Sequence, residues 1–512
     1  MNTSQPTDVS VDTKPGKGFE TLGIDTIPEA LRTYSPWHVF RVLLLGNLCL
    51  SVMVVGWLAI AFGLGFWSAM SAVIVGSVIG GLVLAPMGLF GPKTGTNNAV
   101  SSGAHFGIAG RLVGTVLGLF SAIGFTALTI WTSGDALAGG IGRLFDVPMS
   151  TASRALCYAA MTLIVLGIAI RGFHLLIGAN QYLGPVCGVL MVIGLFAFAP
   201  DFDASYAGGE FLLGSHLATW VLAALVAGST VISYGPFIGD WARYVGETTH
   251  RTRKMLAATG IGAALGIGIP VAWGVYTGVA LTASQSSGSF ALDLVAASPS
   301  WYLMGLLALG LVAGSLQGAI GLYGTGLDTS SLIPGLTRAW ATLVIAAVAT
   351  AFVYLGAFVW EAQAAVSAFL VLLVNILVPW MVILMVGYWW RRGWYSPADL
   401  QVFTRRERGG IYWFTAGLNF RALAAWIPAV VVGLMFSAAP PLLTGPWANA
   451  AGGIDLSFIS AGVLGGLVYA VLLIVFPEPA EVYGPQGPRI RLRSSATAPN
   501  LELRTPAAET SA

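Results

Sequence analysis

Polar side chains gather around a glycine in two of the long apolar stretches of this chain. One stretch contains GNLCLS at 46–51, and another contains GST at 228–230 followed by ISYGPFIGD at 232–240. Backbone that leaves a helix inside a membrane must be buried in protein or line a wet cavity, and amides and hydroxyls there can bind a polar ligand. The two stretches therefore predict interrupted helices around a central site. The polar residues concerned are Asn47, Ser51, Ser229, Thr230, Ser233 and Tyr234.

An alternative is that these glycines only let helices pack closely, as is common in membrane proteins. That explanation covers most of the 66 glycines, but it does not explain why polar residues cluster about Gly46 and Gly228. If the chain consists of two consecutive sets of five helices, both glycines fall in the first helix of a set, and the second set runs inverted because five is odd. Paired interruptions in inverted repeats are typical of a transporter's central site.

Two other function classes fit the sequence less well. A channel needs like polar groups along a continuous pore, whereas the polar groups here occur asymmetrically in two helices. A membrane-embedded enzyme needs a catalytic constellation, and the sequence has no metal-spaced His/Glu set, no nucleophile with an adjacent His and no phosphate loop. We therefore expect neither an enzyme nor a resident cofactor or metal.

The composition places the chain in a lipid bilayer. Hydrophobic residues make up 56% and charged residues 9% of the sequence, against about 25% charged residues in soluble domains, and the mean hydropathy is +0.80. The formal charge of +2 does not suggest a nucleic-acid partner. Cys49, Cys157 and Cys187 lie in apolar stretches, so neither a disulfide framework nor a zinc site is expected. No pattern indicates an oligomeric state.

A membrane span needs about 20 mostly apolar residues, and this rule predicts twelve helices. They are expected at about 38–63, 68–90, 111–138, 155–173, 179–199, 217–239, 255–284, 301–327, 339–360, 363–390, 419–438 and 457–476. The implied regions are an N-terminal tail (1–37), a first five-helix repeat (38–199), a second, inverted repeat (217–390), a cytoplasmic loop (391–418), two extra helices (419–476) and a disordered C-terminal tail (477–512).

Lys and Arg avoid every second connection between the predicted helices. Twenty-two of the 24 fall in the tails or the even-numbered connections, and only Arg143 and Arg154 do not. Short loops rich in Lys and Arg stay cytoplasmic, so both termini are expected inside a multi-pass protein of the cytoplasmic membrane. The first 36 residues contain no apolar core of a signal peptide.

Specific strings in the first 390 residues resemble the cytosine/purine permease branch of the nucleobase:cation symporter-1 family. They are GIDTIPEALRTYSPWHVF (23–40), GNLCLSVMVVG (46–56), FGPKTGTN (90–97), HFG (105–107) and GPFIGDWARY (235–244). The resemblance implies an all-α polytopic membrane protein with a leucine-transporter-like fold of two inverted five-helix repeats plus two C-terminal helices. It also implies import of cytosine, a purine or a related heterocycle such as allantoin, a hydantoin or uracil, by cation symport with alternating access.

Family members hold substrate between helices 1, 3, 6 and 8. Carried over to this sequence, the candidates are Asn47, Leu50, Ser51, Phe125, Ser229, Thr230, Ser233, Tyr234 and Gln317. A nucleobase is a flat, uncharged ring, so Phe125 could stack on its face while the amides of Asn47 and Gln317 bind its edge. The alternatives are a packing or lipid-facing role for Phe125 and an interhelical hydrogen bond for Gln317.

The coupling ion is a separate question. Sodium-coupled relatives combine two hydroxyls on helix 8 with two carbonyls of the helix 1 break. Here carbonyls near Gly46 and Cys49 and the hydroxyl of Ser315 are available, but Leu316 offers no second hydroxyl. We therefore favour a co-transported proton over sodium.

Candidate proton carriers are Asp135 and His174, since proton coupling needs a carboxylate or His whose pKa responds to closure. The alternatives are a weak sodium site completed by backbone and Gln317 oxygens and, for Asp135, a solvated vestibule carboxylate. Asp240 and Arg243 are spaced i, i+3 on helix 6, which predicts a gating or structural pair.

Overall fold

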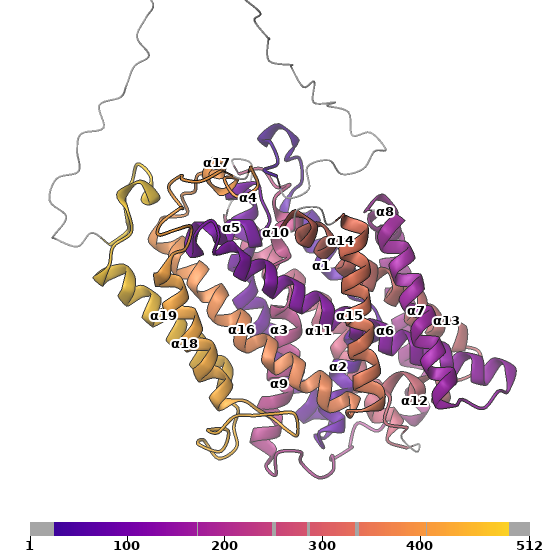
Figure 1. The fold of residues 1–512 in the computed structure, drawn as a ribbon. Coiled ribbons are helices and arrows are strands. Elements are labelled where there is room, and N and C mark those ends of the chain that lie inside the picture. The colour runs from indigo at the N-terminus through magenta and orange to yellow at the C-terminus, as the bar shows by residue number, and fades with distance from the viewer. Residues whose placement is uncertain are drawn as a thin grey trace, which may run out of the picture.

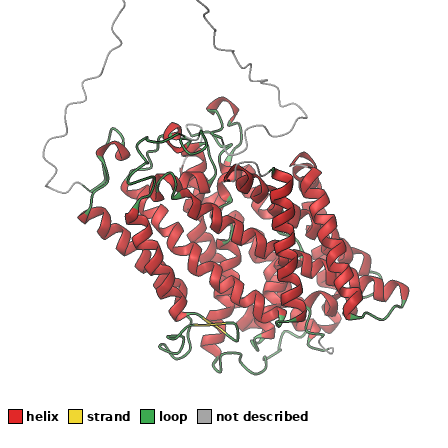
Figure 2. Cartoon of the chain, in the orientation of Figure 1, coloured by secondary structure: helices red, strands yellow, loops and turns green. Residues whose placement is uncertain are grey.

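Long apolar helices form one bundle in this computed structural model, which describes residues 25–171, 173–247, 252–283, 287–332, 337–405 and 407–490. The helices run side by side from one end of the bundle to the other (Figure 1). Strand structure in the described part of the chain is limited to a small antiparallel pair at one end (Figure 2), formed by β1 (Ala438–Ala439) and β2 (Leu443–Thr444).

The predicted spans all appear, in order, among the described residues. Eight single helices and one bent pair are long and apolar enough to cross a membrane, and shorter apolar helices supply the remaining three spans. The spans are α1 (Pro36–Leu45) with α2 (Leu50–Ala61), α3 (Phe66–Leu84) continued by η2 (Ala85–Leu89) and α4 (Phe90–Thr94), α6 (Arg111–Phe145), α7 (Thr151–Arg171), α8 (Phe173–Ala197), α9 (His216–Ile232) with α10 (Ile238–Ala242), α11 (Thr252–Leu281), α13 (Leu303–Leu307) continued by a π-helical turn η4 (Ala308–Ala313) and α14 (Gly314–Leu332), α15 (Arg338–Phe358), α16 (Ala362–Trp390), α18 (Phe420–Phe436) and α19 (Ser457–Val475).

Short helices connect these spans at both ends of the bundle. They are α5 (Asn98–Phe106), α12 (Phe290–Ala297), α17 (Pro397–Leu400) and the 3-10 turns η1 (Glu29–Leu31), η3 (Ala199–Asp201) and η5 (Ala480–Tyr483). Figure 1 shows α5 and α12 at opposite ends. The sequence predicted neither, because hydropathy alone detects only segments long enough to span lipid.

The third span is longer than predicted, since α6 continues to Phe145 rather than ending near 138. The added turns contain Gly139 and Gly140, which lowered the apparent hydropathy. In the structure these glycines let neighbouring side chains approach closely: a Cβ on Gly139 would stand 3.1 Å from Val295, and one on Gly140 would stand 2.7 Å from Leu307. Glycine at these positions therefore serves helix packing.

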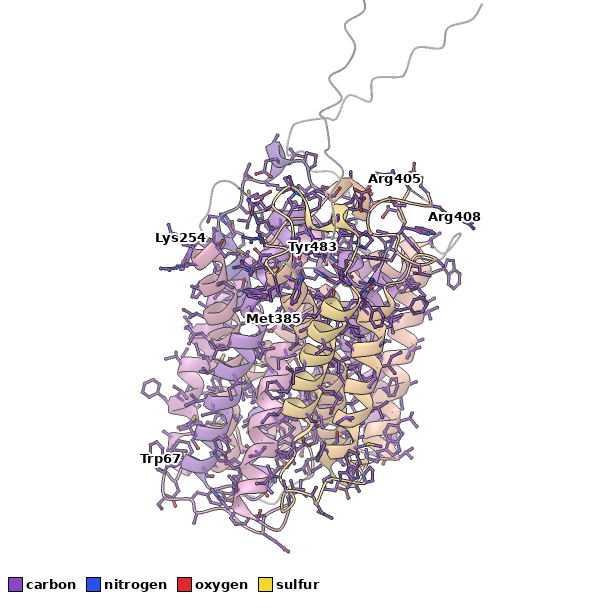
Figure 3. All side chains as sticks on the ribbon, turned by 90° about the vertical axis from the view of Figure 1, so that its left-hand side faces the viewer. Trp67, Lys254, Met385, Arg405, Arg408 and Tyr483 are labelled. Atoms are coloured by element: carbon purple, nitrogen blue, oxygen red, sulfur yellow. The ribbon has the colours of Figure 1, made fainter. Side chains whose placement is uncertain are left out.

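Basic side chains mark one end of the bundle. Lys254, Arg405 and Arg408 lie at that end and Trp67 lies at the other (Figure 3). We call the end that carries these three residues the basic end. The two exceptions to the charge pattern are both held at the opposite end: Arg143 Nη1 donates to Val295 O (2.7 Å), and Arg154 Nη2 lies 3.0 Å from Asp135 Oδ1.

Three of the strings that carry the family resemblance meet at the basic end. Ile27 N donates to Gly95 O (2.9 Å), which joins the N-terminal string to the GPKTG turn, and Arg32 Nη1 donates to Pro92 O (3.1 Å). Tyr34 N donates to Tyr244 O (2.9 Å), which joins the same segment to the end of GPFIGDWARY. The described N-terminal segment therefore ties together the basic-end turns after α4 and α10.

The two last spans lie beside α16 (Figure 1) and are fastened to it by a buried ion pair. Arg391 Nη2 lies 2.8 Å from Glu478 Oε1, and both side chains are almost fully buried. Asn419 Nδ2 donates to the same carboxylate (3.0 Å) and to the backbone oxygen of His105 (2.6 Å). This network links the ends of α16 and α19 with the start of α18 and with α5.

Candidate functional site

The first span breaks where the sequence predicted. The axes of α1 and α2 differ by 64°, and the break runs from Gly46 to Cys49. Asn47 Nδ2 donates to Leu43 O (2.9 Å), so its side chain satisfies a carbonyl that the ending helix leaves without a partner. The break also leaves the N–H groups of Leu50 and Ser51, at the start of α2, without an intrahelical acceptor.

The sixth span breaks between α9 and α10, at residues 233–237. Pro236 has no N–H and cannot continue the helix, and side chains from neighbouring helices bind the freed carbonyls. Asn98 Nδ2, from α5, donates to Gly235 O (2.8 Å), and Ser121 Oγ, from α6, donates to Ser233 O (3.2 Å). Protein groups thus satisfy the broken backbone, as its depth in the membrane requires.

A cavity of about 90 Å³ lies between the two breaks. Its walls come from α2, α6, the break before α10, α10 itself and α14, and seven of the nine predicted substrate-binding residues line it. Those seven are Asn47, Ser51, Phe125, Thr230, Ser233, Tyr234 and Gln317. The cavity is thus polar at the two breaks and aromatic on the α6 side.

Three polar side chains from separate spans bind one another in this cavity. Tyr234 OH donates to Asn47 Oδ1 (2.5 Å), and Gln317 Nε2 donates to Tyr234 OH (3.0 Å) and, at 3.4 Å, to the same Asn47 oxygen. Asn47 is almost fully buried. We call Asn47, Tyr234 and Gln317 the polar triad; it joins the break of the first span, the α9–α10 break and α14 at one point.

Phe125 forms the aromatic wall of the cavity. Its ring meets Phe369, on α16, edge to face with 5.7 Å between centroids. Phe120, on the same span, also contacts Phe369 at 5.5 Å, but it does not line this cavity. Phe125 therefore presents a ring to the cavity while Phe369 supports that ring from behind.

Two predicted residues lie outside the cavity wall. Ser229 Oγ donates to Leu370 O on α16 (2.5 Å), so its hydroxyl joins two helices. Leu50 is buried and packs toward Gly310 of the π-helical turn.

Of the predicted gating pair, Asp240 lines the cavity and the Arg243 guanidinium lies over the Tyr244 ring, 5.3 Å from its centroid.

The sequence analysis missed three hydroxyl residues of α6 that line the cavity: Ser121, Thr126 and Thr129. Thr129 Oγ1 donates to Ser51 Oγ (3.2 Å), whereas Thr126 Oγ1 is buried without a hydrogen-bond partner among the described residues. Ser121 and Thr129 share a helical face with Phe125, and Thr126 lies three residues before Thr129, because positions three and four apart on a helix lie on one side. Extending that face from Phe125 would have found them.

Two of the oxygens proposed for a sodium ion take part in hydrogen bonds within the protein. Cys49 O accepts from Val52 N (3.1 Å) and Met53 N (3.2 Å), and Ser315 Oγ donates to Leu311 O (2.5 Å). Gly46 N donates to Val42 O, and this bond does not involve the Gly46 carbonyl oxygen. The Ser315 hydroxyl donates its proton, so lone pairs remain on its oxygen. The described residues include no group of three or more His, Cys, Asp or Glu side chains that could hold a metal.

The sequence analysis gave a solvated vestibule carboxylate as the alternative role for Asp135. The structure contradicts that alternative. The Asp135 side chain is fully buried and accepts from Arg154 Nη2 (3.0 Å), Tyr158 OH (2.6 Å) and Ser289 Oγ (2.5 Å). The error arose because these donors lie on α7 and just before α12, which the position of Asp135 in its own helix does not reveal. The side chain of His174 lies outside the described residues.

Two broken helices whose polar groups enclose one cavity are typical of the central site of a transporter. Comparison with known proteins agrees with that class. The chain belongs to the family of permeases for cytosine/purines, uracil, thiamine and allantoin, which it matches over residues 26–460.

Individual relatives support the family and the fold. A Bacillus subtilis (strain 168) protein, YxlA, named as a candidate purine-cytosine permease, is 23% identical over 475 residues, covering 89% of this chain and 96% of that protein. Mhp1, a nucleobase-cation-symport-1 family transporter in a closed conformation with bromovinylhydantoin bound, superposes with a TM-score of 0.70 at 19% identity, covering 91% of this chain and 98% of Mhp1.

The fold similarity extends to two further structures. The inward-facing conformation of Mhp1 gives a TM-score of 0.69 at 16% identity, covering 91% of this chain and 97% of that one. A Na+-coupled sialic acid symporter gives 0.54 at 12% identity, with coverage of 88% and 92%. The all-α architecture of two inverted five-helix repeats plus two C-terminal helices is thereby confirmed, as is the family resemblance found in the sequence.

Proposed function

We propose that this permease imports a nucleobase, such as cytosine or a purine, or a related flat heterocycle by cation symport with alternating access. The observation that carries the proposal is the polar triad beside Phe125 in a cavity between two broken helices. The family membership and the hydantoin bound to Mhp1 support a heterocyclic substrate. Allantoin, hydantoins and uracil are the alternative substrates within this class.

The triad suits the edge of such a ring. Asn47 Oδ1 accepts from two donors and its amide nitrogen is committed to Leu43 O, so Gln317 and Tyr234 are the members that can exchange bonds with a ligand. An amide and a phenol offer both donors and acceptors. Thr126 supplies a buried hydroxyl in the same cavity. The ring face would stack on Phe125, which contributes about 0.5–1.5 kcal/mol beyond burial.

For the coupled cation we favour a proton over sodium. A carboxylate, Asp240, lines the cavity, whereas α14 offers the hydroxyl of Ser315 without a second hydroxyl at Leu316. Asp135 pairs with Arg154, and Asp240 is a further candidate carrier beside Asp135 and His174 in this proposal. Sodium remains the second candidate, supported by the Na+-coupled symporter of similar fold.

Uptake into proteoliposomes tests the proposal. Radiolabelled cytosine, purines, uracil, hydantoins and allantoin are offered with an inward proton gradient or an inward sodium gradient, at fixed membrane potential. We expect saturable accumulation of at least one heterocycle that stops when the gradient collapses. Accumulation driven by sodium alone and unaffected by a protonophore would contradict proton coupling. Failure of every heterocycle to accumulate under both gradients would contradict the symporter.

A further inference from the structure

A second cavity lies at the basic end, between α1 and α11. Its volume is about 420 Å³, and none of its lining residues also lines the central cavity. One wall is the first turns of α1 with Ser35, Trp37 and Phe40, and the other is the first turns of α11 with Lys254, Ala257 and Ile261. The positions 254, 257 and 261 recur at helical spacing, so they form a single face of α11.

The mouth of this cavity carries exposed apolar side chains. Trp37 is 61% exposed and Ile261 is 53% exposed, and exposed apolar side chains on a membrane-spanning bundle contact lipid. Tryptophan is enriched where the acyl chains meet the headgroups. The Trp37 and Phe40 rings are stacked, with 4.9 Å between centroids, and give the cavity a flat aromatic wall.

The rim of the cavity is positively charged. Lys254 and Arg253 lie exposed in the first turn of α11, and Lys254 forms no ion pair with a carboxylate in the described part of the chain. Both helices begin here, and helix N-termini carry partial positive charge. Ala257, Ala258 and Ile261 continue inward from the rim as an apolar wall. The cavity is thus cationic at its rim and apolar inside.

We propose that this cavity is a binding site for one anionic phospholipid of the leaflet at the basic end. Its phosphate would lie on Lys254, and one acyl chain would run along Ala257, Ile261 and the Phe40 ring. Basic pockets between membrane helices bind acidic headgroups in this way. A zwitterionic lipid fits less well because its cationic group would lie beside Lys254 and Arg253. The bound lipid joins α1, the half-helix that leads into the first break, to α11.

Native mass spectrometry of the purified full chain in detergent tests the site. The protein is titrated with phosphatidylglycerol or phosphatidylcholine, and bound lipids are counted. Wild type should bind the first phosphatidylglycerol more tightly than the first phosphatidylcholine. Lys254→Ala should weaken that step about fivefold, the effect of one basic residue beside an anionic headgroup, and should leave phosphatidylcholine binding unchanged.

The matched control is Arg408→Ala, which removes the same charge from the same end. Figure 3 shows Lys254 and Arg408 on different sides of that end. Arg408→Ala should bind both lipids as wild type does. An equal loss in the two variants, or no loss in Lys254→Ala, would overturn the proposal, because binding would then follow net charge or not depend on this cavity.

Further measurements test whether a loss of lipid binding comes from misfolding, and whether the site binds a free anion rather than a lipid. Lys254→Arg keeps the charge and should retain the preference for phosphatidylglycerol, whereas its loss there would contradict a headgroup contact. Inorganic phosphate at millimolar excess should not displace phosphatidylglycerol; if it does, the site binds a free anion and the lipid proposal fails. Equal unfolding midpoints of the variants in lipid-free detergent show that they fold alike.

Discussion

Asn47 joins the fold to the candidate site. Its amide nitrogen caps α1 through Leu43 O, and its oxygen accepts from Tyr234 and Gln317. The residue thus stabilises the break and also positions the two side chains that we propose bind the ligand. Replacing Asn47 would remove both roles at once, so Tyr234 and Phe125 give cleaner tests of binding.

We expect Tyr234→Phe to weaken substrate binding by about 1–3 kcal/mol, because the variant lacks the hydroxyl proposed to bond the edge of the ring and leaves that edge unpaired in a buried site. The break should persist, since Asn98 and Ser121 hold its carbonyls. Equilibrium binding of the transported heterocycle to purified protein measures the change. Unaltered affinity would remove Tyr234 from the proposed site.

The second residue-scale prediction concerns stacking. Phe125→Ala should weaken substrate binding by about 1–3 kcal/mol through lost stacking and burial. Phe120→Ala is the control: it removes an equal side chain that also contacts Phe369 but does not line the cavity. Binding titrations of both variants should show a loss only for Phe125→Ala. Equal losses would mean that Phe125 acts through packing on Phe369.

At the scale of elements, some glycines end a helix at a break and others let two helices pack closely. Gly46 ends α1 at the break, whereas Gly56 and Gly274 lie where α2 crosses α11. A Cβ on Gly56 would overlap Val271 O, and one on Gly274 would overlap Met53 O. Small residues let membrane helices approach closely, and here the backbones are in contact. The sequence could not separate the two roles because only tertiary packing distinguishes them.

Gly56→Ala should therefore destabilise the protein by about 1–3 kcal/mol, as overpacking does. The new methyl group meets backbone, which cannot rotate away. Gly167→Ala, on α7, is the control, since a Cβ there meets no atom within 4 Å. Thermal unfolding in detergent measures both variants. A midpoint for Gly56→Ala equal to that of the control would refute the close crossing.

His105, on the short helix α5, should make the stability of the folded protein depend on pH. His105 is fully buried, its Nε2 bonds Tyr395 OH (2.9 Å), and burial together with Arg391 lowers its pKa well below 6.5. The unfolded chain therefore binds a proton near pH 6.5 that the folded protein does not, so stability falls as the pH drops below that value. Thermal midpoints between about pH 8 and pH 5 should fall less for His105→Gln than for wild type. Parallel pH profiles would show that His105 does not contribute.

At the scale of the whole molecule, we propose that both termini face the cytoplasm and that 38–199 and 217–390 form the two repeats. Lys254, Arg405 and Arg408 share one end, and loops rich in such residues stay inside. In intact cells, an impermeant thiol reagent should label Ser205→Cys but not Arg408→Cys. The native cysteines are buried and give little background. The reverse labelling pattern would invert the topology.

The sequence predicted the spans and the first break because long apolar runs and the polar interruptions within them are local features. The second break lies within the polar string 232–240 but after Gly228, which stays inside α9, where a Cβ would stand 2.9 Å from Gly76 O. The sequence analysis missed α5, whose residues are buried against other helices although the segment is polar and short. It also misjudged Asp135, whose donors Arg154 and Ser289 lie far along the chain. In each case the missing information was which segments lie side by side, and that depends on tertiary packing.

The ion pair between Arg391 and Glu478 determines where the protein can be shortened or tagged. Glu478 follows the last span, so a chain cut at residue 476 would keep every membrane helix and still lose the carboxylate that neutralises a fully buried guanidinium. Breaking a buried pair in this way costs about 3–5 kcal/mol. A fluorescent reporter or affinity handle therefore belongs beyond residue 490, after the segment that returns to Trp390 through Arg489.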